Sequence, residues 1–132
     1  MRVLMIGLSL LSAVLFSAPA TANELQPLME QIGKDFKTTF RAAARGMNSE
    51  AEKEVVARLK DNITKSMDVL PDGVSPDDAE LVARYRGLMS MLLEKTVLLE
   101  DAFGTNPMDK PSALALLKEM DALRKRGHGI FR

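Results

Sequence analysis

The chain of 132 residues is long enough for one domain and too short for two full-sized ones. Lysine plus arginine and aspartate plus glutamate number 18 each, so no bulk charge favours nucleic acid or an anionic membrane as a partner. The absence of cysteine excludes disulfides, thiolate metal sites and the C-x-x-C-H motif of covalently attached haem.

The N-terminal segment 1–22 has the three parts of a secretory signal peptide. Residues 1–2 (M-R) are a short positive start, residues 3–16 are a nearly unbroken apolar run, and residues 20–22 (A-T-A) give a small-x-small cleavage pattern. A membrane anchor is the alternative, but about 14 apolar residues fall short of the roughly 20 that span a bilayer. We expect cleavage after Ala22, no stable membrane insertion afterwards, and a periplasmic location, which the sequence does not distinguish from full secretion.

The mature chain, residues 23–132, predicts four helices. Apolar residues recur at steps of three and four along the first, which Gly46 ends in a position where glycine tolerates the left-handed conformation. Ser49 and Glu52 have the spacing of a capping box and open a second helix that extends to Leu70. The stripe of the first helix consists of Leu25, Leu28, Met29, Ile32, Phe36, Phe40 and Ala43.

The segment 71–76 (P-D-G-V-S-P) is the clearest break in the chain. Ser75 is expected to cap the third helix, with the proline after it in the first helical position. This helix ends at Gly104 and carries an apolar seam of the kind used in shallow-angle bundle packing, made of Val82, Tyr85, Met89, Leu92, Thr96, Leu99 and Phe103. The fourth begins near Pro107 or Pro111, a choice that the sequence leaves open. Its apolar side consists of Leu114, Leu116, Leu117, Met120, Leu123 and Phe131. Four amphipathic helices with short connections predict an all-α, antiparallel up-down-up-down four-helix bundle.

Most chemistries that helical bundles support are not available to this chain. A di-iron site needs several inward-pointing Glu-x-x-His pairs, and the chain has one histidine. No oriented nucleophile, glycine-rich phosphate loop or zinc spacing is present. The methionines suggest Cu(I), but apart from Met89-Ser90-Met91 they are scattered along apolar stripes, where methionine usually fills gaps. We therefore do not expect an enzyme.

Two residues at opposite ends of the mature chain are expected to meet. His128, the only histidine, lies four residues before the C-terminus in the basic stretch L-R-K-R-G-H-G-I-F-R, and Met29 is the seventh mature residue. In an antiparallel bundle the first and last turns share one end, so these two side chains could face each other across one pocket. Taken separately, Met29 is ordinary core packing and His128 a complement to the helix dipole.

Several features of the mature chain agree with one family. They are the methionine and histidine just described, the opening N-E-L-Q-P-L-M-E-Q-I, the break at 71–76, and Tyr85-Arg86 early in the third helix. Over essentially all of residues 23–132 the chain resembles cytochrome b562, a family of periplasmic four-helix electron-transfer proteins. The resemblance implies one non-covalent b-type haem per chain, with the Met29 sulfur and a His128 nitrogen as axial ligands. It also implies a periplasmic redox partner, whose identity the sequence does not give.

The resemblance extends to the walls of the haem pocket, with departures. Where the family often has two phenylalanines one turn apart against the haem, this chain has Tyr85 and Met89. Gly127 and Gly129 flank the histidine, and Gly127 would allow close approach of the macrocycle. The connection between the third and fourth helices is a few residues longer than in the family. The remaining expected wall residues are Leu25, Leu28, Ile32, Ile63, Met67, Leu70 and Val82.

Three arginines of the C-terminal stretch, Arg124, Arg126 and Arg132, are candidates to neutralise the haem propionates, although they could equally form a solvated basic turn.

Two other functions remain open. A haem-free periplasmic chaperone or stress module would show exposed apolar residues and dimerise, whereas we expect a monomer or weak dimer. A methionine-based copper carrier would bind Cu(I) even after loss of His128.

Overall fold

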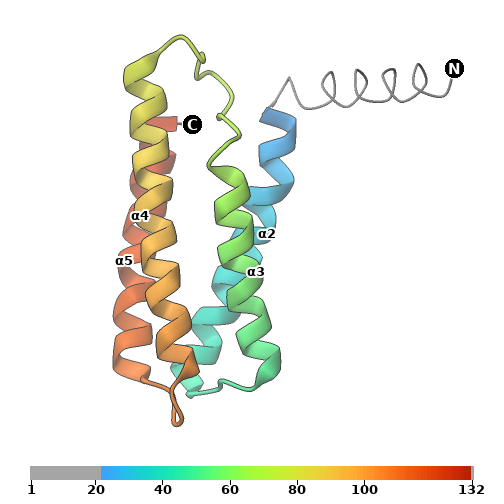
Figure 1. The fold of residues 1–132 in the computed structure, drawn as a ribbon, viewed down its shortest axis with the longest axis vertical. Coiled ribbons are helices and arrows are strands. Elements are labelled where there is room, and N and C mark those ends of the chain that lie inside the picture. Colours follow the sequence, from blue (N-terminus) through green and yellow to red (C-terminus); the bar gives the residue numbers. More distant parts are fainter. Residues whose placement is uncertain (1–21, 132) are drawn as a thin grey trace, which may run out of the picture.

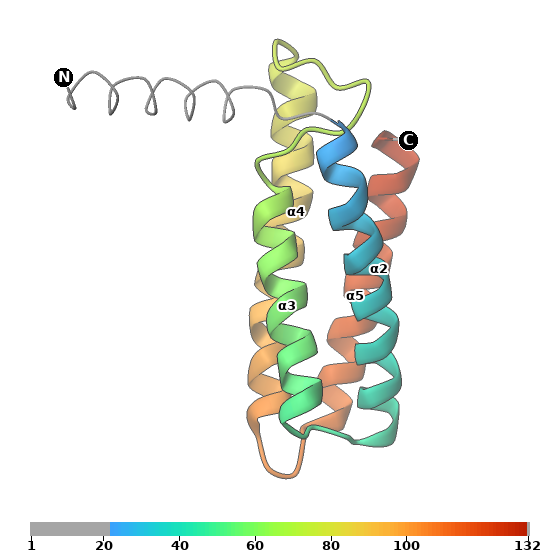
Figure 2. The same cartoon turned by 90° about the vertical axis from the view of Figure 1, so that its right-hand side faces the viewer.

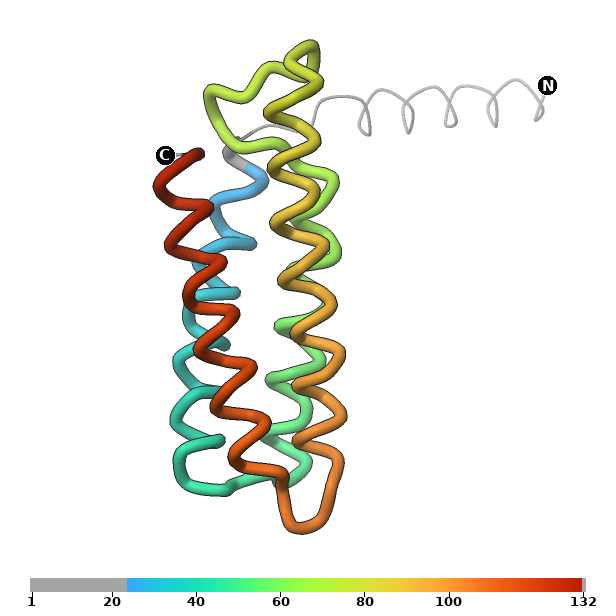
Figure 3. Tube along the Cα trace, turned by 90° about the vertical axis from the view of Figure 1, so that its left-hand side faces the viewer, coloured from blue at the N-terminus to red at the C-terminus, as the bar shows by residue number. Residues whose placement is uncertain are grey.

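The computed structural model describes residues 22–131, which form four helices: α2 (Ala22–Arg45), α3 (Glu50–Ser66), α4 (Ala79–Gly104) and α5 (Lys110–Phe131). The helices alternate in direction, each packing against its neighbours in sequence, and α5 closes the bundle against α2 (Figures 1 and 3). The predicted antiparallel four-helix bundle is confirmed. The proposed signal peptide lies outside the described residues except for Ala22, and no helix within 22–131 is long and apolar enough to cross a membrane.

The connection between α2 and α3 follows the expected capping chemistry. Gly46 adopts a φ of +67°, the left-handed conformation that ends α2. Ser49 precedes α3 as its N-cap, and its backbone N–H donates to the Glu52 carboxylate at 2.7 Å. Hydrogen bonds from the Ser49 hydroxyl and N–H lower the pKa of Glu52. The predicted capping box is confirmed.

The connection between α3 and α4 differs from the prediction at both ends. Helix α3 ends at Ser66 rather than Leu70, and α4 begins at Ala79 with Asp78 as N-cap, its carboxylate accepting from the Leu81 N–H at 3.2 Å. The expected cap at Ser75, with Pro76 as the first helical residue, was wrong. The Ser75 hydroxyl instead accepts from the Asp77 N–H at 3.2 Å within a turn. Aspartate and serine are equally good N-caps, so Ser75 and Asp78 compete for this position, and the structure uses Asp78.

Helix α5 begins at Lys110, which settles the choice that the sequence left open in favour of the start near Pro111. Pro111 occupies the first turn, where its missing N–H costs no helical hydrogen bond. The Asp109 carboxylate accepts from the Ser112 backbone N–H at 3.2 Å and from its hydroxyl at 2.9 Å.

Apolar side chains of all four helices form one core cluster between them. Figure 2 shows the bundle from the side of α2 and α3. The largest side chains with at most 1% exposure are Phe103, Leu59, Ile63, Leu99, Leu117 and Met120. One ion pair joins α2 to α3 beside this core: the Arg58 guanidinium donates to the Asp35 carboxylate at 2.7 and 2.8 Å, and Asp35 is 2% exposed.

The four neighbouring helix pairs are not equally close. Helices α2 and α5 contact each other less than any other neighbouring pair does. The start of α2 and the end of α5 lie at the same end of the bundle, together with the α3–α4 connection (Figures 1 and 2). This end, with its loosely packed side between α2 and α5, is where the first and last residues of the described chain come together.

Candidate cofactor-binding pocket

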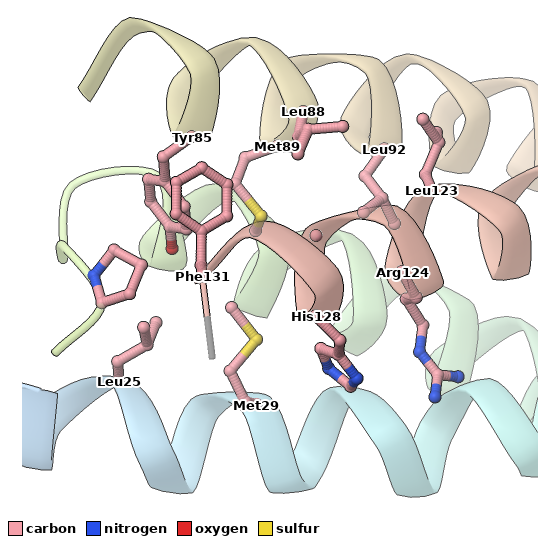
Figure 4. A pocket seen from close by; sticks show the side chains of 12 residues that line it. Leu25, Met29, Tyr85, Leu88, Met89, Leu92, Leu123, Arg124, His128 and Phe131 are labelled. Carbon is pink, nitrogen blue, oxygen red and sulfur yellow. The ribbon is translucent and has the colours of Figure 1, made fainter. Parts of the chain in front are cut away.

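A cavity of about 170 Å³ lies at the end of the bundle where α2 begins and α5 finishes (Figure 4). It is predominantly apolar, and among the described residues Arg124 places a guanidinium on its wall. The wall is formed by Leu25, Met29, Pro71, Tyr85, Leu88, Met89, Leu92, Leu123, Arg124, Gly127, His128 and Phe131.

Met29 and His128 come from different helices and both line this cavity. Figure 4 shows Met29 projecting from α2 toward α5, while His128 projects from α5 toward α2 at a neighbouring level. The Met29 side chain is half-buried and packs against the core, whereas His128 is exposed at the mouth of the pocket. The two residues that were expected to meet therefore line one pocket.

Tyr85 and Met89, the other expected wall residues, are both buried in α4, at 3% and 6% exposure. The Tyr85 hydroxyl donates a 2.6 Å hydrogen bond to the carbonyl of Ser66, the last residue of α3, and so ties α4 to the end of α3. The ring of Phe131 packs edge-on against the Tyr85 ring, with 5.5 Å between centroids. Phe131 thus fills space at the C-terminal side of the pocket.

Burial raises the pKa of Tyr85 to about 12, because the phenolate loses hydration. The folded-state pKa lies above the unfolded value of about 10, so the neutral phenol contributes to the free energy of unfolding. This contribution is complete below pH 10 and disappears as the pH rises through the folded pKa. Tyr85 is the only tyrosine of the chain. We therefore expect tyrosinate absorbance to appear with a midpoint near 12 in the folded protein and near 10 in denaturant. A midpoint near 10 in the folded protein would contradict the buried hydroxyl.

The arginines proposed for haem propionates have different surroundings. The Arg124 guanidinium lines the pocket, lies 5.0 Å from the centroid of the Phe36 ring, and is 3.6 Å from the Asp121 carboxylate. Arg126 is exposed and does not line the pocket. Arg132 lies outside the described residues. Of these side chains, Arg124 alone is placed by the structure beside the pocket.

The rest of the expected wall is only partly present. Leu25 lines the pocket, but the other expected wall residues, Leu28, Ile32, Ile63, Met67, Leu70 and Val82, do not. The sequence reasoning missed Pro71, Leu88, Leu92, Leu123 and Phe131 as wall residues. Leu92, Leu123 and Phe131 lay on predicted apolar stripes, which was an available signal. Leu88 was left out of the predicted seam of α4, although it lies three residues after Tyr85 and four before Leu92, which is helical spacing.

The donor set of this pocket fits a b-type haem. A thioether and an imidazole from two facing helices are a known axial pair for haem iron, and apolar walls exclude water. The cavity is smaller than the roughly 300–1,000 Å³ of pockets that hold drug-sized ligands, so a haem requires this end to open. The loosest helix pair, α2 and α5, carries Met29 and His128, and the Phe131 ring lies on the last turn of α5 against Tyr85.

Among residues 22–131, no group of three or more histidine, cysteine, aspartate or glutamate side chains is arranged to hold a metal ion. No family model, curated protein or solved structure matches the chain.

Proposed function

We propose that this protein is a periplasmic electron carrier that binds one b-type haem, with Met29 and His128 as axial ligands. One observation carries the proposal: the only histidine of the chain and a methionine from a different helix line the same apolar pocket. The resemblance to the cytochrome b562 family supports it, because these are the two positions that bind iron in that family.

When bound, the haem supplies a one-electron couple at its iron. Met29 and His128 would occupy both axial positions, which leaves none open for a substrate and favours electron transfer over catalysis. The soft sulfur of Met29 favours the reduced state and raises the reduction potential relative to a second imidazole. Leu25, Leu92 and Tyr85 keep water from the cofactor, while the exposed side at His128 faces a redox partner.

Haem titration of the purified protein, followed by visible absorption in the oxidised and reduced states, tests the proposal. We expect one low-spin haem per chain, and high-spin spectra or no binding after Met29→Leu and after His128→Ala. Met120→Leu is the matched control, because Met120 is fully buried in α5 and does not line the pocket. A spectrum equal to that of free haem, or one unchanged by both ligand substitutions, would overturn the proposal.

Alanine substitutions at two glycines in the last turns of α5, Gly127 and Gly129, distinguish an effect on cofactor binding from an effect on stability. A methyl group on Gly127 would make an ordinary 3.9 Å contact with Leu88 Cδ1 at the pocket wall, whereas one on Gly129 would meet nothing. Each glycine-to-alanine substitution should stabilise the cofactor-free protein by about 0.5–1 kcal/mol in thermal or urea unfolding, because both positions are helical.

The same two variants should differ in haem affinity. Gly127→Ala is expected to weaken haem binding, since its methyl group occupies the wall that the macrocycle would approach, and Gly129→Ala to leave it unchanged. Equal haem affinities for both variants would show that the cofactor does not approach α5 at Gly127.

A further inference from the structure

The pocket contains a third soft donor atom that a haem with Met29 and His128 as ligands does not use. The thioether of Met89 comes from α4, is 6% exposed, and lines the same cavity as Met29 of α2 and His128 of α5. Figure 4 shows the Met89 side chain extending from α4 toward the space into which Met29 projects from α2. Two thioethers and one imidazole from three different helices therefore line one apolar cavity.

This donor set is selective for one class of metal ion. Thioether sulfur binds Cu(I) and binds hard cations poorly, and the wall residues within 22–131 offer no carboxylate oxygen to Mg²⁺, Ca²⁺ or Mn²⁺. The three ligands are neutral, so a monovalent ion is desolvated at lower cost than a divalent one in this apolar surrounding. The positive charge of Arg124 opposes any cation, but the Asp121 carboxylate 3.6 Å away offsets it.

We infer that the pocket, when it holds no haem, binds one Cu(I) ion through Met29, Met89 and His128. A cavity of about 170 Å³ accommodates a single ion without opening of the bundle. The rotatable bonds of the two methionines allow their sulfurs to move toward a shared ion, and the exposed imidazole provides a route into the pocket from solvent. The inference does not depend on haem binding.

The neighbouring methionine does not belong to this site. Met91 is 43% exposed and does not line the cavity, although the sequence pairs it with Met89. The structure thus separates Met89 from Met91 and places it with Met29. It also places His128 in the site, so copper binding here should be lost with the imidazole. The copper-carrier alternative expected the opposite, that Cu(I) binding survives loss of His128.

An anaerobic competition titration against a coloured Cu(I) chelator tests the inference on the purified cofactor-free protein. We expect one Cu(I) per chain, and a loss of at least about tenfold in affinity for Met29→Leu, Met89→Leu and His128→Ala, since even outer-shell changes cost roughly 10–100-fold. Met91→Leu is the control and should leave the affinity unchanged. Leucine conserves the volume of methionine, and far-UV circular dichroism checks that each variant is folded.

Failure of the native protein to take copper from the chelator would overturn the inference, as would equal losses in Met89→Leu and Met91→Leu. The Met89→Leu variant also separates this inference from the proposed haem site. It should lose Cu(I) affinity, whereas any haem that it binds should still be low-spin, because Met89 lines the pocket but is not an axial ligand in that proposal. Haem-loaded protein should take up no Cu(I) in the pocket, since Met29 and His128 are then already bound.

Discussion

Replacing Met29 with histidine is expected to lower the reduction potential of the haem-loaded protein by on the order of 100 mV, a fraction of the roughly 0.8 V over which axial ligands set haem potentials. The physical reason is the exchange of a soft thioether, which favours ferrous iron, for a second imidazole. Position 29 lies in α2 and lines the pocket, so the new imidazole faces the same space. Potentiometric titration monitored by visible absorption measures the shift.

Met89→Leu provides the comparison for this result. Met89 lines the same pocket, so its substitution tests whether any change of a wall residue alters the potential. We expect a much smaller shift from Met89→Leu than from Met29→His. Similar potentials for native protein and Met29→His, or a higher potential in the variant, would show that residue 29 does not ligate the iron.

Removing the cation of the α2–α3 ion pair is expected to cause a large loss of stability. Asp35 is 2% exposed and accepts three hydrogen bonds, two from the Arg58 guanidinium and one from the Gln31 amide at 3.0 Å. Arg58→Met leaves the buried carboxylate without its counter-charge. We expect the free energy of unfolding to fall by about 3 kcal/mol, the low end of the range for broken buried pairs, because the Arg58 side chain is itself 52% exposed.

Lys60→Met is the matched control for this prediction, measured by urea unfolding at neutral pH. Lys60 lies in the same helix and also pairs across helices, with Glu100 at 2.8 Å, but both side chains are partly exposed. A pair of this kind contributes up to about 1 kcal/mol. Equal losses in the two variants would contradict a special role for the buried Asp35.

The fold was predictable because each helix carries an apolar stripe at helical spacing and the connections carry strong local signals. Gly46 and the capping box at Ser49 are local features, and both were located correctly. The start of α4 was not located correctly, because Ser75 and Asp78 are both good caps. The choice between them depends on the turn that Ser75 forms with Asp77, which no single-residue preference reveals.

Part of the pocket was predictable from chain topology and part from the family resemblance, which named Tyr85 and Met89. Met29 and His128 come together because the first and last turns of an antiparallel bundle share an end. The stacking of Arg124 on Phe36 and the edge-on contact of Phe131 with Tyr85 depend on how helices α2, α4 and α5 rotate about their axes. Sequence spacing grouped Met89 with Met91, whereas a difference of two residues on a helix places the two side chains on different faces.

X-ray absorption at the iron edge of the haem-loaded protein tests the ligation by Met29 and His128 most directly. The account predicts a sulfur scatterer and an axial imidazole on the iron of the native protein, and loss of the sulfur in Met29→Leu. Iron without sulfur in the native protein, or a sulfur that persists in Met29→Leu, would contradict the assignment of Met29 as the axial ligand.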